Sequence, residues 1–222
     1  MEKRNKQRFE ELVGNEVKPL KKEIFWEETE KGRSFNLLIP APILEMDLSN
    51  NEKIVLGFIY SMCNIGGFMN MSYKRIANYL NLSSNTISTT MKQLVELTFI
   101  QKLDKGYVLS NEVVEAIDLR KERTILLPFE IFNSKLNAGA KILWGEYNSI
   151  SKGVKPYYAS RQYTAQRLHM NKSSISSWTT VLKDKQFLTY ELYSGYKFRK
   201  KVVITTIFER NKTNDYNKNV EE

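Results

Sequence analysis

Hydrophobic residues between positions 73 and 97 recur at the spacing of an α-helix face, in two runs separated by a short break. The inward-facing positions are Ile76, Ala77 and Leu80 in the first run and Ile87, Met91 and Leu94 in the second. The break spans only three residues, "NLS", which is too short for antiparallel stacking and favours two helices that cross steeply. The pair is therefore either two packed core helices or a helix-turn-helix whose second helix enters a DNA groove.

The flanking segments extend this helix pair into a small module. An extended "LLIP" segment precedes a predicted helix over 50–62, and a glycine-containing loop follows at 63–71. After the second run, "FIQKL" and "YVLS" flank the turn "DKG", which predicts a β-hairpin. A hairpin placed directly after a helix-turn-helix supplies the wing of a winged helix-turn-helix, so the pattern favours the DNA-binding alternative.

The same pattern recurs after 88 residues. Without a gap, "LLIPAPILEMDLSNNEKIVLGFIYS" falls over "ILLPFEIFNSKLNAGAKILWGEYNS". Among the matched positions, Pro40, Lys53, Gly57 and Ser72 fall on Pro128, Lys141, Gly145 and Ser160. We expect Ser72 and Ser160 to be N-caps of equivalent helices. The second module ends in a predicted hairpin whose strands flank a longer, basic turn over 194–201.

We therefore predict an α+β, mainly helical fold with two tandem winged helix-turn-helix domains that arose by internal duplication. The predicted organisation is a charged leader over 1–36, a first winged-helix domain over 37–110, a connector helix over 111–123, a second winged-helix domain over 124–208 and a disordered tail over 209–222.

Charge and composition narrow the class of partner. The 222-residue chain carries 34 Lys and Arg against 25 Asp and Glu, a net charge of +9. Residues 124–208 alone contain 13 Lys and Arg against four Asp and Glu, so the excess lies in the second module. A basic excess concentrated in this way indicates a polyanionic partner such as double-stranded DNA.

Other classes of protein are disfavoured. One cysteine and one histidine exclude an intramolecular disulfide and a Cys/His zinc site. We recognise no phosphate loop, carboxylate cluster or nucleophile motif, so we expect neither an enzyme nor a cofactor. The charged N-terminus and the lack of a long apolar run predict a cytoplasmic protein without a membrane segment.

Candidate DNA-binding residues lie on the outward face of the third helix of each module and in each hairpin. Short hydroxyl and amide side chains with almost no acidic neighbours suit contact with phosphates and base edges; the alternative is a solvated, Ser/Thr-rich helix face. The candidates in the first module are Ser84, Asn85, Thr86, Ser88, Thr89, Lys92, Lys102 and Lys105. Those in the second are Lys172, Ser173, Ser174, Ser176, Ser177, Thr180, Lys197, Arg199, Lys200 and Lys201.

The segments "IPAPILEMDLSNNEKIVLGFIYS" and "MSYKRIANYLNLSSNTISTTMKQLVELTFIQK" resemble the winged helix-turn-helix module of phage and plasmid replication proteins of low-GC Gram-positive bacteria. The module is also similar to the N-terminal domains of DnaD-type primosome proteins. The tandem arrangement resembles plasmid replication initiators that carry two winged helices. The resemblance implies DNA-contacting roles for the third helices and the hairpins.

Three functions follow as hypotheses. The first is a sequence-specific double-stranded DNA-binding protein that initiates phage or plasmid replication. The second is a transcriptional regulator, repressor or activator, of phage or plasmid type. The third is a protein-contact module within a replisome or polymerase complex, to which the nearly neutral first module is suited. A homodimer or a replication or transcription partner is compatible with each of them.

Overall fold

The computed structural model describes residues 21–24, 35–120, 124–195 and 198–210, and for residues 21–24, 191–195, 198–201 and 209–210 it describes the backbone alone. This part of the chain is α+β and mainly helical. The helices are α2 (Ala41–Glu45), α3 (Asn50–Gly66), α4 (Tyr73–Leu80), α5 (Ser84–Glu96), α6 (Asn111–Leu119), α7 (Phe129–Phe132), α8 (Ala138–Ser151), α9 (Arg161–Leu168) and α10 (Lys172–Asp184). The strands are β1 (Lys21–Ile24), β2 (Leu37–Ile39), β3 (Ile100–Leu103), β4 (Gly106–Leu109), β5 (Ile125–Leu127), β6 (Leu188–Gly195), β7 (Phe198–Thr205) and β8 (Ile207–Arg210).

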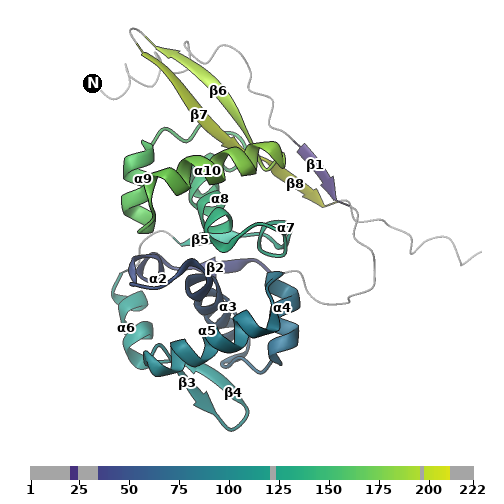
Figure 1. The fold of residues 1–222 in the computed structure, drawn as a ribbon, viewed down its shortest axis with the longest axis vertical. Coiled ribbons are helices and arrows are strands. Elements are labelled where there is room, and N and C mark those ends of the chain that lie inside the picture. The colour runs from purple at the N-terminus through teal and green to yellow at the C-terminus, as the bar shows by residue number, and fades with distance from the viewer. Residues whose placement is uncertain (1–20, 25–34, 121–123, 196–197, 211–222) are drawn as a thin grey trace, which may run out of the picture.

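The described chain forms two halves, one above the other (Figure 1). The first half (residues 35–120) contains α3, α4, α5 and the β3–β4 hairpin, and the second half (residues 124–210) contains α8, α9, α10 and the β6–β7 hairpin. Helices α4 and α9 begin and end 88 residues apart, and so do α5 and α10. The elements therefore follow the same interval that the sequence alignment uses.

Local sequence signals explain where these helices begin. Ser72 accepts a hydrogen bond from the N–H of Arg75 (3.3 Å), and Ser160 accepts one from the N–H of Tyr163 (3.1 Å). Both serines are thus N-caps of α4 and α9, as predicted. Ser49 starts α3 with a reciprocal capping box, in which Glu52 also accepts from the N–H of Ser49.

The turns after the helices also correspond. Asn81 ends α4 and His169 ends α9, both in the left-handed conformation with φ of 50° and 52°. Thr98 and Gln186, which follow α5 and α10, have φ of 59° and 58°. A β-branched residue such as Thr98 adopts positive φ only at a steric cost, so the tight turn into the hairpin is held by the surrounding packing.

A two-stranded ribbon at the centre joins the halves. Strands β2 and β5 pair antiparallel, with Leu38 opposite Leu126. The ribbon packs closely on α3 and α8, because each helix has a glycine beneath it: a Cβ on Gly57 would lie 2.7 Å from Ile39 Cγ1, and one on Gly145 would lie 2.1 Å from Ile125 Cγ2. The absence of a side chain at these two positions therefore allows the close approach.

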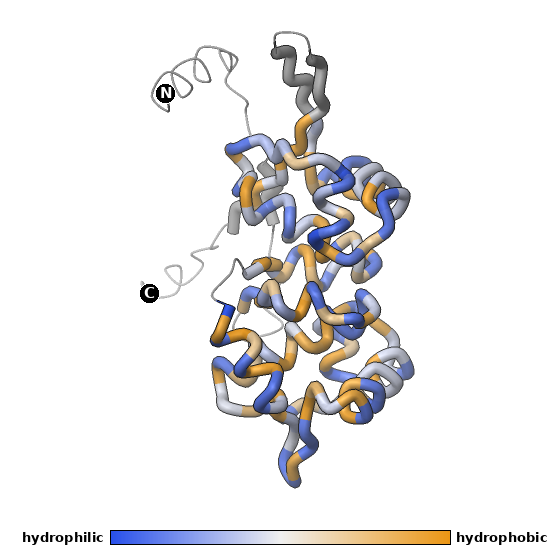
Figure 2. Tube along the Cα trace, turned by 90° about the vertical axis from the view of Figure 1, so that its left-hand side faces the viewer, coloured by the Kyte–Doolittle hydropathy of each residue, from blue (hydrophilic) through white to orange (hydrophobic). Residues whose placement is uncertain are grey.

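One hydrophobic core runs through both halves. Figure 2 shows hydrophobic stretches inside each half and where the halves meet. At that junction the ring of Phe35 lies 5.7 Å from the ring of Phe58 in the first half and 5.3 Å from that of Phe132 in the second. Buried side chains such as Leu37 and Ile125 continue the same cluster. The halves thus share buried apolar surface, which favours one fixed arrangement.

The predicted end of the first helix was wrong. Helix α3 continues to Gly66 and includes residues 63–66, which we had assigned to a loop. Helix-permitting residues continue up to the Gly66–Gly67 pair, and Gly67 then ends the helix in the left-handed conformation. The connector helix α6 is present but ends at Leu119, and residues 121–123 lie outside the described part.

The second hairpin differs more from the prediction. Its strands extend to Gly195 and from Phe198, so Arg199, Lys200 and Lys201 lie in β7 and not in a long turn. Eight consecutive cross-strand pairs extend the strands into residues whose polarity had indicated a turn. Lys197 lies outside the described residues.

The first and last described strands pair beside the second half. Strand β8 continues to Arg210, so residues 209–210, which we had placed in a disordered tail, are in a strand. It pairs in parallel with β1, which belongs to the leader. None of the described helices is both long enough and apolar enough to span a membrane.

A substitution at Gly145 should disturb the central ribbon. The new methyl group of Gly145→Ala would meet Ile125 and Leu127 at 2.1 and 2.6 Å, so the strand must shift. We expect the free energy of unfolding to fall by about 1–3 kcal/mol, measured by urea denaturation. Gly66→Ala is the matched control, since a Cβ there meets nothing within 4 Å. Equal stability of the two variants would contradict the close-packing argument.

Candidate nucleic-acid interface

Helix α5 has one buried face and one polar, outward face. Ser83 caps its start by accepting from the N–H of Thr86 (3.0 Å), and its hydroxyl also pairs with that of Thr86 at 2.8 Å. The buried side chains are Ile87, Thr90, Met91 and Leu94. Of the candidates, Ser84, Asn85, Thr89 and Lys92 are exposed, and Thr86 and Ser88 are half-buried. Helix α5 therefore presents its candidates to solvent while its other face packs on α3 and α4.

Helix α10 repeats this division. Its buried side chains are Ile175, Thr179 and Leu182. The candidates Lys172, Ser173, Ser177 and Thr180 are exposed, and Ser174 and Ser176 are half-buried. Each helix carries its only acidic residue at its last position, Glu96 in α5 and Asp184 in α10. The rest of both outward faces is thus free of groups that repel phosphate.

The hydroxyl groups of α10 are engaged with their own helix. Ser176, Ser177 and Thr180 each donate to the carbonyl four residues earlier, at 3.1–3.2 Å. Their oxygen lone pairs remain as acceptors, so contact with a base amino group needs no change of rotamer. Donation to a phosphate oxygen requires the hydroxyl hydrogen to leave its intrahelical acceptor.

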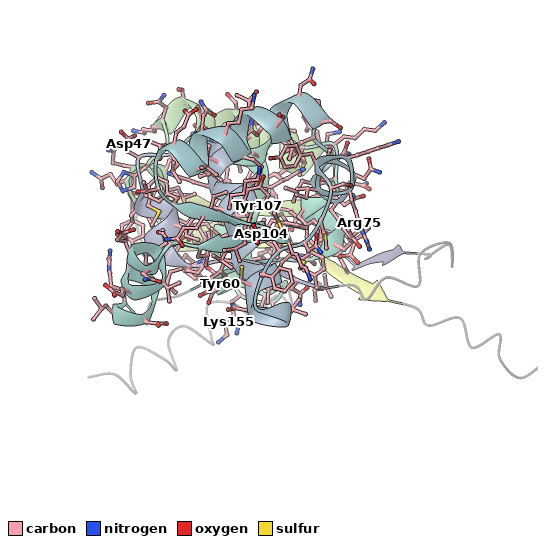
Figure 3. The ribbon with its side chains drawn as sticks, turned by 90° about the horizontal axis from the view of Figure 1, so that it is seen from below. Asp47, Tyr60, Arg75, Asp104, Tyr107 and Lys155 are labelled. Carbon is pink, nitrogen blue, oxygen red and sulfur yellow. The ribbon has the colours of Figure 1, made fainter. Side chains whose placement is uncertain are left out.

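The hairpins lie at opposite ends of the molecule (Figure 1). In the first hairpin both candidates, Lys102 and Lys105, are exposed. Figure 3, seen from the end that carries this hairpin, places Asp104 and Tyr107 in it. Tyr107 anchors the hairpin, because its backbone bridges to Met69 and its hydroxyl lies 2.7 Å from that of Tyr73 at the start of α4. For the second hairpin only the backbone of Arg199, Lys200 and Lys201 is described.

Two buried lysines, one in each half, each contact the end of a helix in the other half. Lys141 on α8 donates to the carbonyl oxygens of Leu80 (2.7 Å) and Phe132 (2.9 Å). Lys53 on α3 lies 3.5 Å from the carbonyl of Leu168. Leu80 and Leu168 are the last residues of α4 and α9, where the carbonyls lack intrahelical partners and the helix dipole favours a cation.

Asn133 adds further bonds at the end of α4. Its amide donates to the carbonyls of Asn78 (2.7 Å) and Tyr79 (2.9 Å), and its own carbonyl accepts from the amide of Asn81 (3.0 Å). The turn between α4 and α5 is therefore fixed by residues of the second half. Sequence reasoning did not assign a role to these residues, although lysine at both positions 53 and 141, within an apolar helix of each module, was an available signal.

Burial changes the acidity of both ammonium groups. Loss of solvation lowers the pKa of Lys141 from 10.5 to about 8. The pKa of Lys53 is also lowered by burial, and the negative charge of Asp47 partly offsets that effect. With a pKa of about 8, Lys141 still carries its proton at neutral pH. The side-chain nitrogens of both lysines face helix-end carbonyls.

In the second half, polar contacts hold α9 and α10 on α8. Glu146 of α8 is fully buried and accepts from Tyr157 Oη (3.0 Å) and Arg167 Nε (3.2 Å). The hydroxyl of Tyr147 pairs with that of Thr179 on α10 at 2.9 Å, and burial raises the pKa of Tyr147 to about 12. Arg167 and Thr179 thus bind α9 and α10 to the same supporting helix.

The structure brings α5 and α10 to one face of the molecule, where both lie in front of α3 and α8 (Figure 1). It places the two hairpins at the far ends of that arrangement. Among the described residues, no group of three or more His, Cys, Asp or Glu side chains could hold a metal ion. The arrangement offers a polar binding surface assembled from separate parts of the chain.

The sequence matches a known protein family. The family model described as Firmicute plasmid replication protein (RepL) matches residues 10–142, more than half of the chain. The matched range includes the first half with α5 and ends within α8. No curated protein matches the chain.

Replacing Lys141 should reduce the pH dependence of stability in alkaline solution. Because its pKa is lowered from 10.5 to about 8 in the folded chain, the unfolded chain binds the proton more tightly between these values. The free energy of unfolding should therefore rise with pH from about 8 to 10, with a contribution from Lys141 of at most about 1.4 kcal/mol per unit. Lys141→Met should show a smaller rise, because only the contribution of Lys53 is left of the two buried lysines. Urea titrations across this window measure it.

The exposed Lys92→Met is the matched control and should keep the pH dependence of the unmodified chain. If Lys141→Met also keeps it, the buried ammonium is not its source.

Proposed function

Because the chain belongs to the Firmicute plasmid replication protein (RepL) family, we propose that it is an initiator that binds specific double-stranded DNA at a plasmid origin. The observation that carries this proposal is the common face of α5 and α10, with exposed Asn85, Lys92 and Ser173 and without acidic residues before the last position of either helix. Such side chains suit contacts with base edges and phosphates.

We interpret the two halves as tandem winged helix-turn-helix units that arose by duplication. The support is the 88-residue interval between corresponding helices and between the positive-φ turns at Asn81 and His169. In each half a hairpin follows the third helix and bridges to an earlier segment, through Met69–Tyr107 and Tyr157–Val203. Met69 and Tyr157 lie 88 residues apart, and Tyr107 and Val203 both belong to the second strand of their hairpin. In this interpretation α5 and α10 are the recognition helices and the hairpins are the wings.

The charge distribution supports a division of labour between the halves. The basic excess lies in residues 124–208, and the β6–β7 hairpin is twice as long in residues as β3–β4. The second half is therefore suited to hold the DNA backbone. The proposed role is binding and not catalysis, and it requires no cofactor.

The other two hypotheses have weaker support. The family match favours plasmid replication over a phage or transcriptional role. A protein-contact role is a second candidate for the first hairpin, because Leu103 in the hairpin and Phe68 beside it are 45% and 40% exposed and line one hollow with Lys102 and Lys105. A homodimer or a replication protein partner is compatible with the proposal.

Replacing Asn85, or Ser173 and Ser176 together, with Ala should reduce discrimination between the target site and random DNA. Each lost base contact should cost about 1–3 kcal/mol of specificity, measured by competition binding to origin fragments and shuffled duplexes. Asn111→Ala, an exposed amide at the start of α6, is the matched control. An equal loss of affinity for both kinds of DNA would make these residues phosphate contacts.

Replacing Arg199, Lys200 and Lys201 with Ala should weaken binding to all sequences alike. Each phosphate contact releases counterions, so the slope of log K against log salt should flatten by about 0.9 per lost contact, and by about 2–3 units if all three bind phosphate. Lys102→Ala with Lys105→Ala should flatten it less. An unchanged slope in the first variant would exclude a phosphate role for that strand, and an unchanged slope in the second would favour protein contact there.

A further inference from the structure

We infer that one copy of the chain binds a single DNA site composed of two half-sites in inverted orientation, at one fixed spacing. This inference rests on the proposed DNA-binding function and specifies its substrate. It follows from the way the two halves are joined.

The central ribbon defines the relation between the halves. Leu38 pairs with Leu126, its own counterpart 88 residues later, and the flanking pairs are Leu37 with Leu127 and Ile39 with Ile125. Exchanging each residue for its counterpart turns one flanking pair into the other. An antiparallel pairing with this property has an approximate two-fold axis through its central pair.

Side-chain contacts away from the ribbon obey the same relation. Lys53 approaches the carbonyl of Leu168, and Lys141 donates to that of Leu80. Each lysine and each acceptor is the counterpart of the other, 88 residues apart. The two-fold relation therefore extends to the ends of α4 and α9, which lead into the two recognition helices.

The axis places both recognition helices on one face in opposite directions. In Figure 1, α4 lies on the right of the first half and α9 on the left of the second, and α5 and α10 extend from these positions across the front of the molecule. B-DNA has two-fold axes of its own, and a protein with this symmetry reads two half-sites on opposite strands. Two heads in tandem orientation would instead read a direct repeat.

The spacing between the half-sites is fixed by contacts across the junction of the halves. The Phe35 ring packs against Phe58 and Phe132 of the two halves, and Asn133 binds the end of α4. Heads on a flexible linker tolerate variable spacing, whereas heads that share a core do not. The chain should therefore recognise one centre-to-centre distance, close to a helical turn of about 10 bp or a multiple of it.

The half-sites should be related but not identical. Counterparts on the outward faces differ in chemistry, with Asn85 replaced by Ser173 and Lys92 by Thr180. The amide of Asn85 can make the bidentate contact with adenine that a serine hydroxyl cannot. The expected target is an imperfect inverted repeat.

The test is in vitro selection of randomised duplex DNA with the full chain, followed by binding to four designed duplexes. These carry the selected half-sites inverted, the same half-sites as a direct repeat, one half-site alone, and the inverted pair with about half a turn, 5 bp, inserted. We expect the inverted pair to bind about a hundredfold more tightly than the single half-site, and the other two to bind like the single half-site. Mass photometry should give one chain per inverted site.

Substitutions in each half of the protein show which half-site that half reads. Asn85→Ala should relax the preference at one half-site only, and Ser173→Ala with Ser176→Ala at the other, with Asn111→Ala as control. A preference for the direct repeat, tolerance of the 5-bp insertion, or two chains on each inverted site would overturn the inference and leave specific DNA binding intact. Selection that enriches no sequence over random duplex would overturn the proposed function as well.

Discussion

Two lysine ammonium groups are buried between the halves, and their bonds orient α4 and α9 together with the helices α5 and α10 that follow them. Lys53 and Lys141 are each 1% exposed, and burying a charge is costly unless polar groups compensate. The compensation comes from carbonyls at the ends of α4 and α9, which need donors because their helices stop there. Each half therefore satisfies a requirement of the other, and the orientation of both helix pairs follows from this exchange.

The same junction explains why the two halves share one core while α5 and α10 each keep a polar face toward solvent. The β2–β5 ribbon packs on glycines of α3 and α8, so the two central helices lie close to it and to each other. The outward helices α5 and α10 pack on these supports through Ile87, Met91, Ile175 and Leu182 and leave their hydroxyl and amide groups in solvent. The chain belongs to a plasmid replication protein family. The contacts at the junction fix how α5 and α10 lie relative to each other.

The halves differ in charge and in hairpin length around this common frame. The first is nearly neutral, with a short hairpin anchored by Tyr73 and Tyr107. The second carries the basic excess, a longer hairpin and a buried Glu146 that binds Arg167 of α9. One nearly symmetric frame thus supports two surfaces of different charge.

The sequence by itself determined the elements whose cause is local. Helical spacing predicted α4, α5, α9 and α10, Ser72 and Ser160 marked two N-caps, and the 88-residue register predicted which elements correspond, because periodicity and capping depend on neighbouring residues. The tertiary structure alone decided the length of the second hairpin, the pairing of β1 with β8, and the contacts of Lys53, Lys141 and Asn133 across the junction. Strand β1 pairs with β8 across 186 positions, as for Lys21 and Ile207, and Lys53 meets the carbonyl of Leu168 across 115. Partners this far apart in the chain meet only when the whole chain folds, and burial of the shared core brings those of the junction together.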